Sequence, residues 1–214
     1  GDVLDMENYI FTLESWDYAK DDKAFEIILS VQNLTLNKKP KYDFVLKSDN
    51  DIIETKVHRI IKGERIVLRA YNVPGRWTEV TLSISAGKHN SHIGMNDKEV
   101  NKTDKLKNLS NKEYEIKAGK ALMDGLRIKM IKEEKEIQKL DEKINYAYDK
   151  LVKLEEQKEQ QTEKEKETTN ASKSQIANEM ERLKGELDVK MTEYNEHKAK
   201  YLKEMEHVAK LRSE

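Results

Sequence analysis

Residues 123–161 read MDGLRIKMIKEEKEIQKLDEKINYAYDKLVKLEEQKEQQ, and this stretch decides the fold. Apolar side chains recur in it at alternating steps of three and four, whereas the residues between them are mostly Lys, Glu, Asp and Gln. This spacing puts a narrow apolar stripe on one side of a helix, and the stripe needs a second helix to cover it. Nine of its ten positions are apolar, and Glu133 is the exception. The stretch therefore predicts one helix of a coiled coil.

A second apolar stripe follows between residues 176 and 211, with His197 as one of its polar interruptions. Its phase differs by one residue from that of the first stripe, which favours a turn between two helices. We expect helix 113–166, a turn near 167–171 that Asn170 or Ser172 caps, and helix 172–213. One continuous helix with a skip residue, paired with a second chain, is the alternative. The predicted coiled-coil interface consists of Met130, Ile137, Leu140, Ile144, Leu151, Leu154, Met180, Leu183, Leu187, Tyr194, Tyr201 and Val208.

Residues 8–86 have a different pattern, in which apolar and polar residues alternate with a period of two. The run Phe25, Ile27, Leu29, Val31 is typical, and Gly, Pro, Asn and Asp interrupt the pattern about every ten residues. Six or seven short antiparallel strands of this kind fit a small β-sandwich, immunoglobulin-like or similar. We expect the Lys62-Gly63 turn to join two of them as a hairpin.

The predicted fold class is therefore α+β with the two kinds of structure segregated along the chain. An antiparallel β-sandwich head takes residues 1–95, with one possible edge strand around 91–95. A linker takes residues 96–112, and an antiparallel coiled-coil hairpin takes residues 113–214. The capping-box spacing of Ser110 and Glu113 places the helix start at this boundary.

Composition excludes several classes of protein. Of the 214 residues, 38% are charged and 36% hydrophobic, which is too polar for one globule of this length. The net charge of −1 gives no general attraction to nucleic acid, and the absence of Cys excludes thiolate chemistry. No run of 18 apolar residues predicts a membrane span, and the first residues do not resemble a signal peptide. We expect a cytoplasmic or virion-associated protein.

Polar residues do not form a recognisable catalytic or metal site. His89 and His92 lie three residues apart without an evident third ligand, and the Asp-containing loops lack the ordered spacing of calcium ligands. Convergence of Asp22, Asp49 and Asp51 would favour calcium. We therefore expect no enzyme activity, no metal and no other cofactor.

Aromatic residues are the candidate partner contacts in the head: Trp16, Tyr71 and Trp77. An exposed platform formed by Trp16 and Trp77 side by side would favour a carbohydrate ligand. Burial of Trp77 as a plug at one end of the sandwich is the alternative reading.

A small all-β module followed by a coiled coil resembles the layout of upper-baseplate and tail proteins of phages. More loosely, it resembles the head-and-stalk scaffold proteins of DNA repair and centrioles, whose heads contain helices. The layout implies a non-enzymatic structural or adaptor protein, with a partner-binding head and a helical arm for spacing, oligomerisation or a second protein contact. A phage or secretion-machine component is one alternative. A carbohydrate-binding or calcium- and lipid-binding module on a stalk is another.

Overall fold

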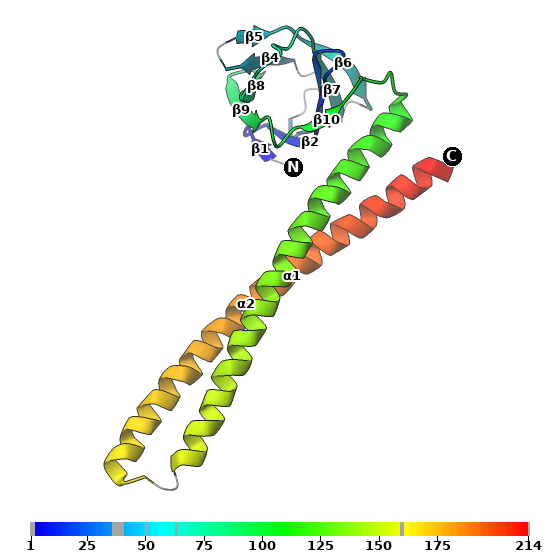
Figure 1. Ribbon diagram of the computed structural model, residues 1–214. Coiled ribbons are helices and arrows are strands. Elements are labelled where there is room, and N and C mark those ends of the chain that lie inside the picture. The colour runs from blue at the N-terminus through cyan, green and yellow to red at the C-terminus, as the bar shows by residue number, and fades with distance from the viewer. Residues whose placement is uncertain (1–2, 36–40, 50, 63, 159–160, 214) are drawn as a thin grey trace. The chain divides into compact units, whose positions relative to one another are not determined.

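The computed structural model describes residues 3–35, 41–49, 51–62, 64–158 and 161–213 (Figure 1). The chain divides into two compact units. The head unit comprises Gly1–Leu122 and Met205–Glu214, and the arm unit comprises Met123–Glu204. Strands precede helices along the chain, so the fold is α+β with the two kinds of structure segregated. Two sequence features that predict turns lie outside the described residues: the turn-prone segment Asn37-Lys-Lys-Pro40, and Gly63 of the predicted Lys62-Gly63 hairpin.

The first sheet of the head unit contains the strands β1 (Val3–Asp5), β2 (Tyr9–Ala19), β3 (Ala24–Asn33), β7 (Arg65–Ala70) and β6 (Thr55–Ile61) in that spatial order. β10 (Asn101–Thr103) joins the same sheet beside β2. All neighbours are antiparallel except β10, which pairs parallel to β2.

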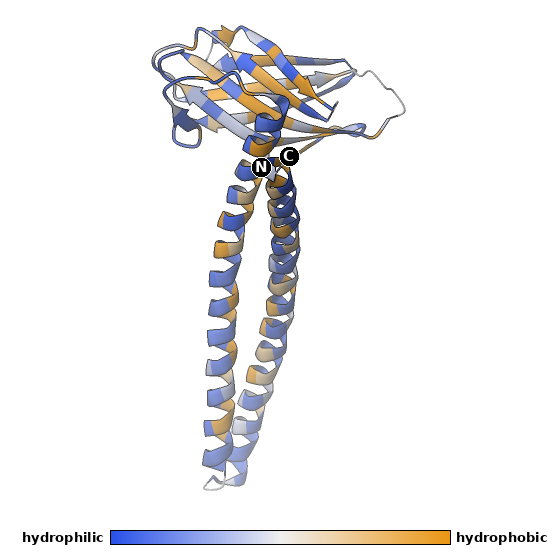
Figure 2. Ribbon diagram, turned by 90° about the vertical axis from the view of Figure 1, so that its right-hand side faces the viewer, coloured by the Kyte–Doolittle hydropathy of each residue, from blue (hydrophilic) through white to orange (hydrophobic). Residues whose placement is uncertain are grey.

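The second sheet contains β5 (Asp51–Ile53), β4 (Tyr42–Ser48), β8 (Glu79–Ala86) and β9 (His89–Asn96), all antiparallel. One apolar core takes side chains from both sheets, including Phe11 and Ile27 from the first and Leu46 and Leu82 from the second. Figure 2 shows the alternation of hydrophobic and hydrophilic positions along these strands. The period-two pattern therefore marks a face turned toward the core.

The β structure extends further along the chain than the sequence indicated. The segment around residues 91–95, expected as a possible edge strand, lies within the longer strand β9. Residues 96–112, expected to be a linker, contain β10, whose residues pair with Asp17, Tyr18 and Ala19 of β2. A three-residue strand has too few positions to show a period, which explains why the pattern did not reveal it.

A β-bulge in β2 reverses the sides on which its residues face. The register of β2 against β3 shifts between Leu13 and Ser15. As a result, Leu13 and Trp16 both enter the core although three positions separate them, and Asp17 turns to the opposite face. Strict alternation would have put Trp16 outside and Asp17 inside, so the bulge decides the place of both side chains.

The two helices are α1 (Asn111–Lys158) and α2 (Glu163–Ser213). Ser110 and Glu113 form the predicted capping box: the Ser110 N–H donates to the Glu113 carboxylate at 2.7 Å, and the Glu113 N–H donates to the Ser110 hydroxyl at 3.3 Å. α1 thus begins two residues before the expected position 113.

The break between the helices lies nearer the N-terminus than predicted. Residues 167–171, expected to be the turn, lie inside α2. The start of α2 is marked by Thr162, whose N–H and hydroxyl both donate to the Glu165 carboxylate at 2.8 and 2.6 Å. The sequence carries this Thr-x-x-Glu signal, and the following Glu and Lys residues are good helix formers, so the helix continues through the predicted turn.

Within the arm unit α1 and α2 lie side by side in opposite directions (Figure 1). Polar contacts between the helices show the antiparallel arrangement, because residues later in α1 contact residues earlier in α2. The contacts are Glu133 with His197, Glu134 with Tyr194, Glu136 with Lys190, and Glu155 with Lys173. Burial follows the predicted spacing, since every position of the first stripe from Met123 to Leu154 is buried or half-buried. The buried positions of α1 therefore follow the predicted stripe, and polar side chains connect the two helices along their length.

Glu133 and His197, which are polar residues within the two apolar stripes, contact each other across the helix pair. Glu133 Oε1 lies 2.8 Å from His197 Nδ1, and Glu133 is 8% exposed. Glu133 Oε2 is buried without a hydrogen-bond partner. A buried polar pair of this kind costs stability but opposes other registers of the helices.

Replacing both Glu133 and His197 by Leu is expected to raise the free energy of unfolding of the arm by about 1–4 kcal/mol. The single substitution His197→Leu is expected to lower it, because Glu133 is left buried without its partner. Urea unfolding followed by far-ultraviolet circular dichroism measures both changes. A double variant less stable than the wild type would contradict this reading of the pair.

Candidate functional site

The first candidate site begins with a row of charged residues across three strands of the first sheet. Strand register aligns Asp17 of β2 with Glu26 of β3, and Glu26 with Arg69 of β7. All three are buried, and they lie on the face of the sheet opposite the core. The Arg69 Nε donates to Glu26 Oε2 at 2.9 Å. Buried charges are tolerated only when paired and hydrogen-bonded, so this face must be covered by another element.

The first turns of α1 provide the cover. Tyr114 and Lys117 are three residues apart and therefore lie on one side of the helix. The Tyr114 hydroxyl donates to Glu26 at 2.8 Å and accepts from Arg69 at 3.0 Å. The Lys117 Nζ lies 2.6 Å from Glu26 and 2.5 Å from Asp17. These five residues form what we call the buried charge cluster.

The segment before α1 completes the hydrogen bonding of Arg69. The guanidinium donates to the Lys107 carbonyl at 2.6 Å and to Asn108 Oδ1 at 2.9 Å. Asn101 of β10 donates to Asp17 at 3.2 Å. The segment expected to be a linker thus borders the buried charge cluster, and its polar groups form hydrogen bonds with Arg69 and Asp17.

The electrostatics of the buried charge cluster favour its charged forms. Burial alone would raise the pKa of Glu26, but hydrogen bonds and charge from Lys117, with further hydrogen bonds from Arg69 and Tyr114, hold this pKa below its usual value. Burial would likewise lower the pKa of Lys117, but the charge of Asp17 and hydrogen bonds to both carboxylates raise it above its usual value. Both groups are therefore charged and stabilising at neutral pH.

Two tyrosines are expected to titrate late in the folded protein. Burial, followed by the hydrogen bond to Glu26, raises the pKa of Tyr114 to about 12, and burial followed by the charge of Tyr9 raises that of Tyr42 to about 12. Because both pKa values in the folded protein lie above the usual tyrosine value of 10.0, stability from these groups is complete below pH 10 and is lost as the pH rises through about 12. Tyrosinate absorbance should show titrations near pH 12 from these two groups, and Tyr114→Phe should remove one of them. Loss of neither in that variant would contradict the assignment.

An apolar patch beside the buried charge cluster also holds α1. Ile28, Val67 and Ile61 of the first sheet pack with Tyr114 and Ala118 of α1, and all five are buried. The first sheet is therefore covered on both faces, by the core on one side and by α1 on the other. The start of α1 is fixed to the head unit by charge pairing and by apolar packing together.

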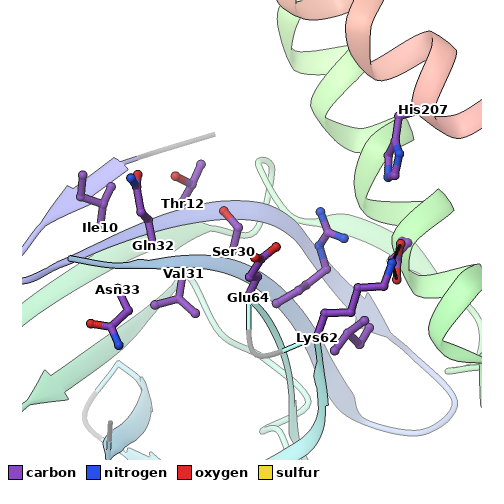
Figure 3. Close-up of a pocket in the computed structure, with 12 residues that line it drawn as sticks. Ile10, Thr12, Ser30, Val31, Gln32, Asn33, Lys62, Glu64 and His207 are labelled. Atoms are coloured by element: carbon purple, nitrogen blue, oxygen red, sulfur yellow. Dashed lines mark hydrogen bonds and ion pairs between the residues drawn. The ribbon is translucent and has the colours of Figure 1, made fainter. Parts of the chain in front are cut away.

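A groove of about 600 Å³ lies next to this patch on the same face (Figure 3). We call it the head groove. Figure 3 shows Ile10, Thr12, Ser30 and Gln32 on neighbouring strands and His207 on a helix across from them. The lining residues are Ile10, Thr12, Ser30, Val31, Gln32, Asn33, Ile61, Lys62, Glu64, Arg65, Glu115 and His207.

Ion pairs and polar side chains give the head groove its chemistry. Lys62 pairs with the buried Glu115 at 3.0 Å, and Arg65 makes two hydrogen bonds to Glu14, at 2.5 and 2.8 Å. Hydroxyl and amide groups of the strand residues line the remainder. The groove thus presents donors and acceptors, with the Lys62 and Arg65 cations paired to carboxylates, which suits recognition of a polar polypeptide segment.

Two of the three predicted aromatic contacts are wrong. Trp16 and Trp77 are 3% and 8% exposed and belong to the core, where Trp77 packs edge-on against Phe25 and Tyr18. Tyr71 is 40% exposed. The side-by-side exposed Trp platform that would favour a carbohydrate is therefore not formed by these residues.

The twelve predicted interface residues of the helices all lie on the facing sides, buried or half-buried. Leu183 and Val208 are the most enclosed, at 4% and 3% exposed. Val208 lies in the head unit, as does the buried Leu211.

Metal ligands do not converge in the described part of the chain, where no three His, Asp or Glu side chains group closely enough to hold an ion. Asp22 instead accepts a hydrogen bond from the Leu106 N–H at 2.6 Å, and Asp49 accepts one from Thr78 at 2.7 Å. Neither described helix has an apolar stretch sufficient to cross a membrane.

Sequence reasoning missed the buried charge cluster, although a signal for it exists. Glu26 lies within Phe25-Glu-Ile-Ile-Leu29, where Ile27, Ile28 and Leu29 are consecutive apolar residues. Such a run indicates a strand covered on both faces, and a Glu in that strand needs a buried partner. The same argument applies to Arg69 after Ile66-Val67-Leu68.

Comparison of the chain with protein-family models, with curated proteins and with solved structures found no match. Function must therefore be argued from the geometry of the chain itself.

Proposed function

We propose that this chain is a non-enzymatic structural or adaptor protein. Its head binds a protein partner through the head groove, and its two helices provide spacing and a second protein contact. We also propose that the two sheets form a β-sandwich and that the helices form a coiled-coil hairpin. The shared apolar core of the two sheets supports the first assignment. The three-four spacing of the buried positions supports the second.

One observation carries the proposal: α1 is a single helix of 48 residues that belongs to both units. Its first turns are fixed in the head unit by Tyr114 and Lys117, and its remaining turns supply one apolar stripe of the arm unit. The buried charge cluster attaches the start of the helix to the first sheet, and the same helix continues into the arm unit, so one element links the proposed partner site to the arm.

The head groove is the partner site that we propose. The groove has a volume of about 600 Å³, and the side chains of Thr12, Ser30 and Gln32 offer hydrogen bonds along it. Those groups are spaced along two adjacent strands, which suits an extended polar segment of a partner more than a compact small molecule.

A photo-reactive amino acid placed at Gln32 tests the partner site. Illumination in the cell of origin should give a discrete adduct, heavier than the chain of 25.1 kDa by the mass of one partner. His92 on β9 is the matched control, because it is also an exposed strand position but belongs to the second sheet. Equal adducts at both positions, or none at Gln32, would refute the head groove as the contact.

A further inference from the structure

The arm unit has a second groove that the proposed function does not explain. Two hollows of about 600 and 500 Å³ lie between α1 and α2, and both are lined by Lys139 and Lys143. Because they share these residues, they form one continuous surface, which we call the arm groove. It extends over residues 136–150 of α1 and 175–190 of α2.

The arm groove is apolar along its floor. Leu140, Ala147 and Leu183 belong to the stripes through which the helices face each other, and they also line the groove. Tyr146 and Val189 on its walls are 71% and 57% exposed. A continuous exposed apolar surface bordered by charged side chains is typical of a protein-interaction site.

Gly185 opens the groove on the α2 side. It lies in the interior of a helix, where Gly costs about 1 kcal/mol relative to Ala. A Cβ added at this position would meet nothing within 4 Å, so packing inside the chain does not require Gly there. The missing side chain allows another helix to approach closely.

The two walls of the arm groove carry opposite net charge. The α1 wall has three lysines (Lys139, Lys143, Lys150) and two carboxylates (Glu136, Glu142), whereas the α2 wall has two carboxylates (Glu179, Glu186) and Lys190. Glu179 and Glu186 also pair with Arg182 on their own helix, and the charge of Lys143 acts on Glu179 within the chain. The ion pairs between the helices that the described residues form use Lys173 and Lys190 and not the three lysines of the α1 wall.

We infer that the arm groove binds the arm groove of a second copy of this chain, forming a four-helix dimer. Lys143 and Glu186 line the same hollow and so lie at the same level, as do Lys150 and Glu179 in the other hollow. A two-fold axis parallel to the helices places the α1 wall of one copy against the α2 wall of the other. Lys143 then faces Glu186 of the second copy, and Lys150 faces Glu179.

The other two-fold arrangement is disfavoured by the same charges. An axis perpendicular to the helices would place α1 against α1 in opposite directions. With the axis near the middle of the groove, Lys143 would face its own copy, a like-charge contact, and the pairs of Lys143 with Glu186 and of Lys150 with Glu179 would not form. The charge pattern therefore favours the arrangement in which the two α1 helices are parallel.

This inference rests on the proposed function, because it names the second protein contact of the arm. An experiment can refute the dimer without refuting the head groove as a partner site. The photo-crosslink at Gln32 reports on the head groove whether or not the arms dimerise.

Light scattering on the purified chain tests the dimer. The expected mass is twice 25.1 kDa. Lys143→Glu should raise the dimer dissociation constant by about tenfold or more, because it places two like-charge contacts in each dimer. The double reversal Lys143→Glu with Glu186→Lys should restore dimerisation, and unchanged circular dichroism would show that each variant still folds.

Lys184→Glu is the matched control, since it makes the same charge change two residues from Glu186. Two residues correspond to roughly 200° around the helix, so Lys184 lies away from the arm groove. Its dissociation constant should equal that of the wild type. A chain that stays monomeric, or a dimer weakened by Lys184→Glu and not by Lys143→Glu, overturns the inference.

Disulfide formation tests the direction, because the natural chain has no Cys. A mixture of Lys143→Cys chains and Glu186→Cys chains should give a covalent dimer under mild oxidation. Lys143→Cys chains alone should give none, since the two α1 helices lie diagonally across the bundle. The reverse pattern would show α1 packed on α1 and would overturn the proposed geometry.

Discussion

Replacing Arg69 by Met is expected to lower the free energy of unfolding of the head unit by about 3 kcal/mol. The guanidinium donates to Glu26, to the Tyr114 hydroxyl, to Asn108 and to the Lys107 carbonyl. Without it, the buried Glu26 carboxylate and Tyr114 hydroxyl each lose a donor, and Lys117 is the cation that still pairs with Glu26 among the described residues. A loss of this size should lower the melting temperature by about 10 °C.

Tryptophan fluorescence measures this change in the head alone, because both tryptophans of the chain, Trp16 and Trp77, lie in the head core. Lys56→Met is the matched control: it also removes a cation from the first sheet, but Lys56 pairs with Glu54 in the solvent. No change in melting temperature is expected there, since exposed ion pairs contribute little. If Arg69→Met had the same melting temperature as the wild type, the buried charge cluster would not be what holds α1 to the sheet.

Replacing Leu140 and Ile144 together by Asp is expected to unfold the arm unit while the head stays folded. Both side chains are half-buried between the helices, and isolated helices of this composition depend on their partner for stability. Truncating a buried aliphatic side chain costs about 2–4 kcal/mol, and a carboxylate placed there adds the cost of desolvation. The far-ultraviolet helical signal should fall, and tryptophan fluorescence should not change.

Ile128→Asp with Val152→Asp is the control for this double substitution. Those residues are 70% and 41% exposed on the same helix, so the same chemical change should leave the helical signal nearly intact. Equal losses in the two double variants would mean that the stripe has been placed on the wrong side of α1.

Much of the helical part of the chain could be predicted from its sequence. The three-four spacing predicted positions that are buried or half-buried, and the capping box of Ser110 and Glu113 marked the start of α1. The turn was misplaced because polar composition near residue 170 does not end a helix, whereas the Thr162-Glu165 capping signal marks where α2 starts. The candidate site was predicted less well: Trp16 and Trp77 are in the core, whereas Glu26 and Arg69 were not singled out.

The local sequence pattern determined the secondary structure of most segments. Helix caps, stripe spacing and strand alternation act between residues a few positions apart, and the free energies involved can be read from the chain itself. The sequence alone therefore specified strands followed by two helices, and the stripes that the helices bury.

Only the tertiary structure decided which distant side chains meet. The bulge after Leu13 turned Asp17 outward, and strand register aligned it with Glu26 and Arg69. α1 then brought Lys117 onto the Asp17 and Glu26 carboxylates, although Glu26 lies 91 residues earlier in the chain. The meeting of Glu133 with His197 depends in the same way on where α1 ends and α2 begins. A buried charge is tolerated only when its oppositely charged and hydrogen-bonding partners are all in place. These sites therefore depend on the whole fold and cannot be predicted from any one segment.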